Sequence, residues 1–140
     1  MTIEVPRHFE GVYFLRLTLT DEQGKQLSQN DYVQCTEGSD RTPLHDMRRA
    51  QVGATAAVTG TRARITLTNN GNVPAVMLRL NLKGSDGEQI LPVIYSDNYL
   101  HLMPGESRVI NIEWKIEDAR GVQPIVEITG TNVSKNTVQL

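Results

Sequence analysis

The chain has 140 residues, a formal net charge of −2 and a sequence pI near 5.9. This length can bury a core without a disulfide or a metal ion. The charge gives no basic field for nucleic acid or an anionic membrane, so neither partner is expected, and no apolar run is long enough to span a membrane. The one cysteine, Cys35, excludes an internal disulfide and is expected to be a passive thiol.

The first predicted element is a β-hairpin. Residues 11–20 alternate in polarity, as a strand with two different faces does. A short loop with a glycine occupies residues 21–25, and residues 26–34 return as the second strand. One face of the first strand is apolar and needs a partner; it carries Tyr13, Leu15, Leu17 and Leu19.

A change of composition follows the hairpin. Residues 35–47 have the composition of a linker. One helical turn is predicted over residues 46–50. A boundary is therefore expected here, and it divides the chain into a hairpin (1–34), a linker (35–47) and a second domain (48–140).

The second domain is predicted to consist of short strands at regular spacing. Seven are expected, over residues 52–58, 63–68, 76–82, 90–95, 99–103, 108–116 and 125–130. Pro104-Gly105 suits a type II turn, because proline presets φ and glycine accepts a positive φ. The strand after that turn alternates strictly, and it places on one face Ile110, Ile112, Trp114 and Ile116.

The strands and turns together predict an all-β fold. No long stretch has helical periodicity, and turn residues separate the strands. Seven strands within about ninety residues are typical of an antiparallel immunoglobulin-like β-sandwich. The expected architecture is therefore this sandwich with an additional N-terminal β-hairpin.

Several motifs of the second domain resemble a known family. The chain carries Asn69-x-Gly71-x-x-Pro74-Ala75, Leu91-Pro92-Val93, Ser96-Asp97-Asn98-Tyr99, Leu102-x-Pro104-Gly105-Glu106-Ser107-Arg108 and Gly130-Thr131-Asn132-Val133. In this order they resemble the C-terminal immunoglobulin-like domain of family 2 glycoside hydrolases of the β-mannosidase and exo-β-glucosaminidase type. The hairpin is similar to the last hairpin of the sandwich domain that precedes it there, although Asp31-Tyr32-Val33 stands where the family has an aromatic pair.

The resemblance implies an accessory domain without catalytic residues or cofactors. Its role would be architectural, and its partners would be other domains of the same polypeptide. The parent would be a glycoside hydrolase that acts on β-linked sugars, and the family suggests an exported bacterial enzyme. Residues 1–34 would then be the tail of the preceding domain.

No catalytic or metal site is predicted in this chain. The family's two glutamates lie on a (β/α)8 barrel of about 250 residues, which is absent here. Asp97 and Glu106 are the one carboxylate pair worth considering; we expect Asp97 to organise its turn and Glu106 to be solvated. The histidines lack ligand spacing, so we expect no metal at His8, His45 or His101.

A sugar patch is the alternative function at the turn after residue 95. Tyr95, Asp97, Asn98 and Tyr99 could contact a carbohydrate or a neighbouring domain, whereas the structural interpretation has the two tyrosines pin the turn. Trp114 is expected in the core. The third alternative is a surface adhesion or assembly module, and the exposed hairpin also predicts a homodimer. The arginines alternate on outer strand faces among acids, which does not indicate a nucleic-acid site; they are Arg48, Arg49, Arg62, Arg64, Arg79 and Arg108.

Overall fold

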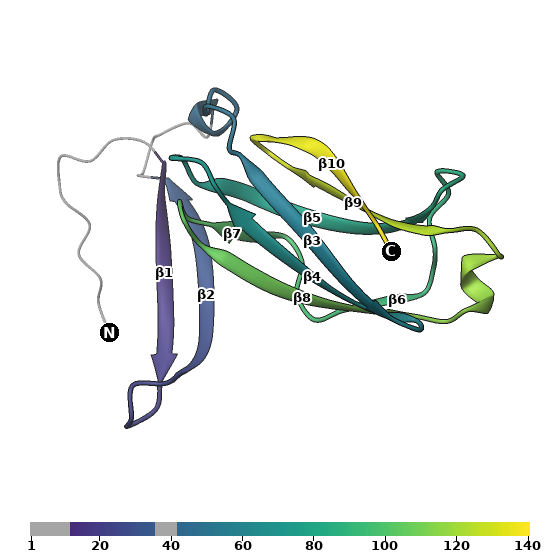
Figure 1. Ribbon diagram of the computed structural model, residues 1–140. Helices are drawn as coiled ribbons and strands as arrows, with labels where there is room; N and C mark the ends of the chain where they lie inside the picture. The colour runs from purple at the N-terminus through teal and green to yellow at the C-terminus, as the bar shows by residue number, and fades with distance from the viewer. Residues whose placement is uncertain (1–11, 36–41) are drawn as a thin grey trace, which may run out of the picture. The chain divides into compact units, whose positions relative to one another are not determined.

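The computed structural model of the protein describes residues 12–35 and 42–140, and their secondary structure is β apart from two short 3-10 turns. The chain divides into two compact units, residues 1–47 and 48–140. The first unit contains the predicted hairpin, β1 (Val12–Thr20) and β2 (Gln26–Cys35), in antiparallel register (Figure 1). The strands are joined by a turn in which the Asp21 carboxylate accepts the N–H groups of Gln23 and Lys25.

The helical turn predicted over residues 46–50 is wrong. A 3-10 turn lies earlier, as η1 (Thr42–Leu44), where Pro43 supplies a φ suited to a helical start. Ala50 is part of a parallel bridge to Val133, and its N–H donates to the carbonyl of Asn132 at 2.9 Å. None of the described helices is long and apolar enough to cross a membrane.

The second unit is a sandwich of two four-stranded sheets. One sheet has the order β10–β9–β5–β7 and the other β3–β4–β8–β6, and their paired strands are antiparallel (Figure 1). The strands are β3 (Val52–Thr59), β4 (Arg62–Asn69), β5 (Ala75–Gly84), β6 (Val93–Tyr95), β7 (Leu100–Leu102), β8 (Ser107–Trp114), β9 (Pro124–Gly130) and β10 (Val133–Gln139). A second 3-10 turn, η2 (Glu117–Ala119), connects β8 to β9.

The core lies between the two sheets and follows from the alternation in the sequence. Every second residue of the central strands is fully buried; the set includes Ile65, Leu67, Leu78, Leu80, Leu82, Ile110, Ile112, Val126 and Ile128. Burial of each such side chain stabilises the folded state by roughly 1.5–3 kcal/mol relative to leaving it exposed to water. The predicted type II turn at Pro104-Gly105 is confirmed, because Glu106 N donates to Met103 O at 3.0 Å and Gly105 has φ +78°.

Ile116 does not belong to the buried face of β8, as its alternation had predicted. Trp114 ends the strand, and Ile116 has helical dihedrals (φ −65°, ψ −36°) at the start of η2. Its side chain is therefore 75% exposed. Local 3-10 hydrogen bonding, from Ala119 N to the Ile116 carbonyl at 3.2 Å, ends the alternation two residues early.

The strand predicted over residues 90–95 is two separate pieces. The N–H of Ile90 donates to the carbonyl of Leu82 in β5, and the Ile90 side chain is fully buried. The chain then crosses to the other sheet, where β6 begins at Val93 opposite Trp114. The sequence analysis also missed β10, an eighth strand that pairs with β9. Its exposed polar run, Ser134 to Thr137, hides the alternation that marks a half-buried strand.

Candidate functional site

Two side chains of the predicted patch take the place of a strand beside β5. The paired residues of β5 and β7 end at Leu78 and Leu100. Beyond that pair, Asn98 Oδ1 accepts the N–H of Leu80 at 2.9 Å, and Asn98 Nδ2 donates to the Leu80 carbonyl at 3.0 Å. Tyr95 lies on β6, and its hydroxyl accepts the N–H of Leu82 at 2.8 Å. These contacts give the backbone of β5 partners that a neighbouring strand would otherwise supply.

The partly buried position of Tyr95 has an electrostatic consequence. Burial raises the pKa of the Tyr95 hydroxyl, because the phenolate would lose its hydration there. The neutral hydroxyl accepts the Leu82 N–H and keeps its own proton. Tyr95 and Asn98 therefore serve the fold, and neither presents its polar group freely to a ligand.

Tyr99 and Asp97 are the members of the patch that face solvent. Tyr99 is 55% exposed, has φ +57°, and its ring centroid lies 6.0 Å from the Arg79 guanidinium carbon. A left-handed φ is unfavourable for a tyrosine, and such strain is found at binding sites more often than elsewhere. Asp97 Oδ1 accepts the N–H of Asn98 at 2.8 Å, and Oδ2 lies 3.6 Å from Arg108 Nη1. The turn thus holds one exposed aromatic ring in a fixed position.

Asp97 and Glu106, the carboxylate pair that the sequence offered as candidate catalytic residues, both bond the local backbone. Glu106 is not simply solvated, as had been expected, because its Oε2 accepts the N–H of Met103 at 2.8 Å across the Pro-Gly turn. Asp97 has the turn and Arg108 contacts given above. Both carboxylates thus hold local backbone, and neither has a described contact that would set it up as a general acid.

His101 is a structural residue of β7. It is 5% exposed, and its Nδ1 accepts the N–H of Met77 at 3.1 Å, so that nitrogen is unprotonated. Met77 has φ +53° in the irregularity of β5 between Ala75 and Leu78. His45 is exposed in the first unit, and His8 lies outside the described residues. Among residues 12–35 and 42–140, no group of three or more His, Cys, Asp or Glu side chains is placed to hold a metal ion.

Two buried asparagines were not singled out as functional by the sequence. Asn69 Nδ2 donates to the carbonyls of Val73 and Leu102 at 2.8 and 3.0 Å, and its Oδ1 accepts the N–H of Gly71 at 3.0 Å. These bonds satisfy two groups of the loop before β5 and the carbonyl of Leu102 in β7. Asn69 belongs to the motif that resembles the family, and this role explains why an amide suits that position.

Asn132 has the same role beside the first residues of β5. Its Oδ1 accepts the N–H of Val76 at 3.0 Å, and its Nδ2 donates to the carbonyls of Pro74 and Arg48 at 2.8 and 3.1 Å. Asn132-Val133-Ser134 matches an N-glycosylation sequon. The side chain is only 2% exposed, and its nitrogen already donates twice, so the folded domain does not offer this nitrogen to a glycan.

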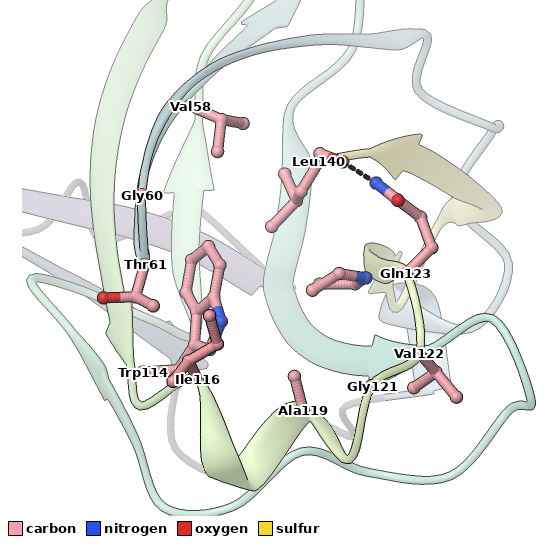
Figure 2. A pocket seen from close by; sticks show the side chains of 11 residues that line it. Val58, Gly60, Thr61, Trp114, Ile116, Ala119, Gly121, Val122, Gln123 and Leu140 are labelled. Carbon is pink, nitrogen blue, oxygen red and sulfur yellow. Dashed lines mark hydrogen bonds between the residues drawn. The ribbon is translucent and has the colours of Figure 1, made fainter.

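An open hollow of about 350 Å³ lies at one end of the sandwich. Trp114 and Leu140 face each other across it, and the Gln123 amide donates to the Leu140 carbonyl (Figure 2). The hollow is lined by Val58, Gly60, Thr61, Trp114, Ile116, Ala119, Gly121, Val122, Gln123, Pro124 and Leu140. Trp114 is 8% exposed, which confirms its predicted place in the core. No side chain of the lining is a carboxylate, imidazole or thiol, so these side chains offer apolar contact and no acid–base chemistry.

Comparisons with known proteins agree with one another. Residues 30–133 match the model of the exo-β-D-glucosaminidase Ig-fold domain. The chain is 31% identical to exo-β-D-glucosaminidase of Streptomyces avermitilis and 35% identical to that of Hypocrea virens, over 90% and 93% of its own length. It spans 17% of the length of each. The crystal structure of exo-chitosanase CsxA of Amycolatopsis orientalis superposes on all of this chain and on 19% of its own, with a TM-score of 0.88 and 28% identity.

Proposed function

The chain belongs to the family of exo-β-D-glucosaminidase Ig-fold domains, and from that membership we propose that it is an accessory domain of a larger family 2 glycoside hydrolase. The parent enzyme would remove β-linked glucosamine from the end of an oligosaccharide. The domain itself contributes no catalytic residue and no cofactor. Its role is architectural, and its partners are other domains of the same polypeptide.

One observation supports this role above the others. The polar side chains of the family motifs bond the domain's own backbone, as Asn69, Asn98 and Asn132 do. These three side chains make at least eight hydrogen bonds with backbone groups, and each bond satisfies a donor or acceptor of a loop or a strand. A domain whose distinctive residues are used in this way is built for rigidity, which suits a support for a catalytic domain.

The hairpin has a separate place in the proposal. We assign residues 1–34 to the tail of a preceding sandwich domain and residues 35–47 to the linker. The family match begins at residue 30, which leaves β1 outside it, whereas the similarity to CsxA extends over the whole chain. This is the pattern expected if relatives carry the hairpin as part of the neighbouring domain.

Two measurements test the proposal. An immunoblot of the source cells with an antibody against residues 48–140 should detect a protein several times larger than the 15.6 kDa of this chain. The purified chain should release no nitrophenol from PNP-β-D-glucosamine, the compound present in a second CsxA structure. A native band near 15.6 kDa, or turnover above the blank, would contradict the accessory role.

The second candidate function is carbohydrate binding at Tyr95, Asp97, Asn98 and Tyr99. The exposed ring of Tyr99 on a fixed turn favours it, because sugars stack on such rings. Titration with chito- and manno-oligosaccharides should then show binding that is lost in Tyr99→Ala and kept in Tyr32→Ala, a similarly exposed tyrosine of the hairpin. Equal binding by both variants, or none by the native chain, would exclude a sugar site at this turn.

A further inference from the structure

The outer strands of the two sheets differ in how they avoid pairing with other chains. In the described sandwich the sheet edges are β3, β6, β7 and β10. β6 and β7 have three residues each, and β10 carries Lys135 and an irregular register between Val133 and Asn136. Short length, charge and irregularity are the usual protections of an exposed edge.

β3 has none of these protections. It is eight residues long, with the sequence Val-Gly-Ala-Thr-Ala-Ala-Val-Thr, and it contains no charge and no proline. It pairs with β4 without a register shift from Val52 to Thr59. Among the residues that the structure describes, no strand pairs with its other side. The bridge between Ala50 and Val133 precedes β3 and uses none of its backbone groups.

The side chains of β3 also permit close approach. Its register opposite Ile65 and Leu67 of β4 directs Ala54 and Ala56 toward the core, where they pack as partly buried residues. The opposite face of β3 carries residues no larger than threonine; they are Gly53, Thr55, Ala57 and Thr59. An uncharged, regularly paired edge strand with small side chains is a template for a further strand.

We propose that β3 binds β3 of a second copy of this chain, antiparallel and around a two-fold axis at Thr55. In a two-fold contact each residue meets the image of its own surroundings, so a charge near the axis meets a like charge. Lys135 imposes that cost on β10, whereas β3 has no charged residue. The symmetry therefore favours β3 among the longer edges as the place where two copies join.

The pleat requires the two-fold axis to pass at a residue of β3, and Thr55 lies beside the middle of this strand. Directly opposite residues of antiparallel strands point to the same face of a sheet. A two-fold axis at Thr55 places Ala54 opposite Ala56 of the second copy, and both of these side chains belong to core faces. Gly53 likewise lies opposite Ala57 of the second copy, on the outer faces. This contact would join the β3–β4–β8–β6 sheets of the two copies into one continuous sheet. The proposed dimer does not depend on the accessory role proposed above.

Sedimentation equilibrium of the whole chain tests the contact. Small interfaces are weak, so we expect a monomer–dimer equilibrium between about 5 and 500 µM. Thr55→Lys places two ammonium groups at the axis and should abolish the dimer. Thr137→Lys makes the same change on β10, at an exposed residue, and should leave the dimer unchanged. Trp114 fluorescence confirms that each variant is folded.

A cross-link tests the register independently. In a Cys35→Ser background, mild oxidation of Thr55→Cys should give a covalent dimer, because the two positions face each other at the axis, while Thr137→Cys should stay largely monomeric. A native chain that is monomeric at about 500 µM would overturn the proposal, since even weak interfaces populate a dimer there. A dimer that persists in Thr55→Lys would also overturn it and would point to the hairpin instead.

Discussion

Asn132 joins three segments of the sandwich, and its truncation should be costly. Asn132→Ala removes the acceptor of the buried Val76 N–H and the donor to the Pro74 and Arg48 carbonyls. An unsatisfied buried N–H costs about 1–3 kcal/mol, and each lost carbonyl bond about 0.5–1.5 kcal/mol. The sum predicts a loss of about 2–6 kcal/mol in the free energy of unfolding, which is a substantial part of the 5–15 kcal/mol of a typical domain.

Trp114 makes this loss measurable in the sandwich alone. It is the one tryptophan of the chain and lies buried in β8, so its fluorescence follows unfolding of the second unit. Urea titration should show an unchanged slope and a much lower midpoint for Asn132→Ala. In a thermal melt the midpoint should fall by at least about 8 °C, given about 4–8 °C per kcal/mol for a domain of this size.

The matched control is Asn136→Ala on β10, the strand that follows Asn132. Asn136 is exposed, and its one given side-chain contact is with the N–H of Thr137. Its truncation should change stability by no more than about 0.5 kcal/mol. If Asn132→Ala costs less than about 1 kcal/mol, or no more than the control, then the buried amide does not hold these segments together and the reasoning from unsatisfied backbone groups fails.

Three further predictions follow from individual contacts. Ile112→Ala should cost about 2–5 kcal/mol and Ile116→Ala almost nothing in the same urea assay, and equal losses would contradict the end of β8 at Trp114. Lys83 lies 3.0 Å from Glu127, and its hydrogen bond is the main cause of the lowered pKa of that carboxylate. A carboxylate whose pKa is lowered on folding stabilises the protein above its unfolded pKa of 4.5, and this stability is lost as the pH falls through the folded pKa. Lys83→Met should therefore flatten the acid side of the stability–pH curve. An unchanged slope would refute this. Gly105→Ala should cost about 1–2 kcal/mol, because φ is +78° there, and a neutral effect would argue against the type II turn.

The segment from Tyr95 to Tyr99 shows that residues of an exposed turn can stabilise the fold by bonding the backbone of a distant strand. In the sequence, Tyr95, Asp97, Asn98 and Tyr99 are four polar or aromatic residues within a segment of five. The structure separates them by what each contacts, since Asn98 and Tyr95 bond the backbone of β5, which lies in the other sheet. No local rule gives that contact, because its partners at Leu80 and Leu82 are 18 and 13 residues earlier in the chain.

The family motifs gain a physical meaning in the same way. Asn69 and Asn132 belong to the motifs that resemble the family, and their contacts explain why an amide stands at both positions. Each amide both accepts a backbone N–H and donates to two backbone carbonyls, which no carboxylate or hydroxyl of similar size can do in one place. The motif residues that resemble the family are thus residues that bond the domain's own backbone.

The sequence by itself determined the elements whose signal is local. Alternation placed Ile110 and Ile112 in the core, and the Pro104-Gly105 pair specified its turn, because both depend on neighbouring residues alone. The tertiary structure decided where alternation stops, as at Ile116, and where a polar segment is drawn into a sheet, as in β10. It also decided which strand is left as an edge. Strand order and the satisfaction of backbone groups across the sandwich depend on contacts between distant residues, and periodicity along the chain does not encode them.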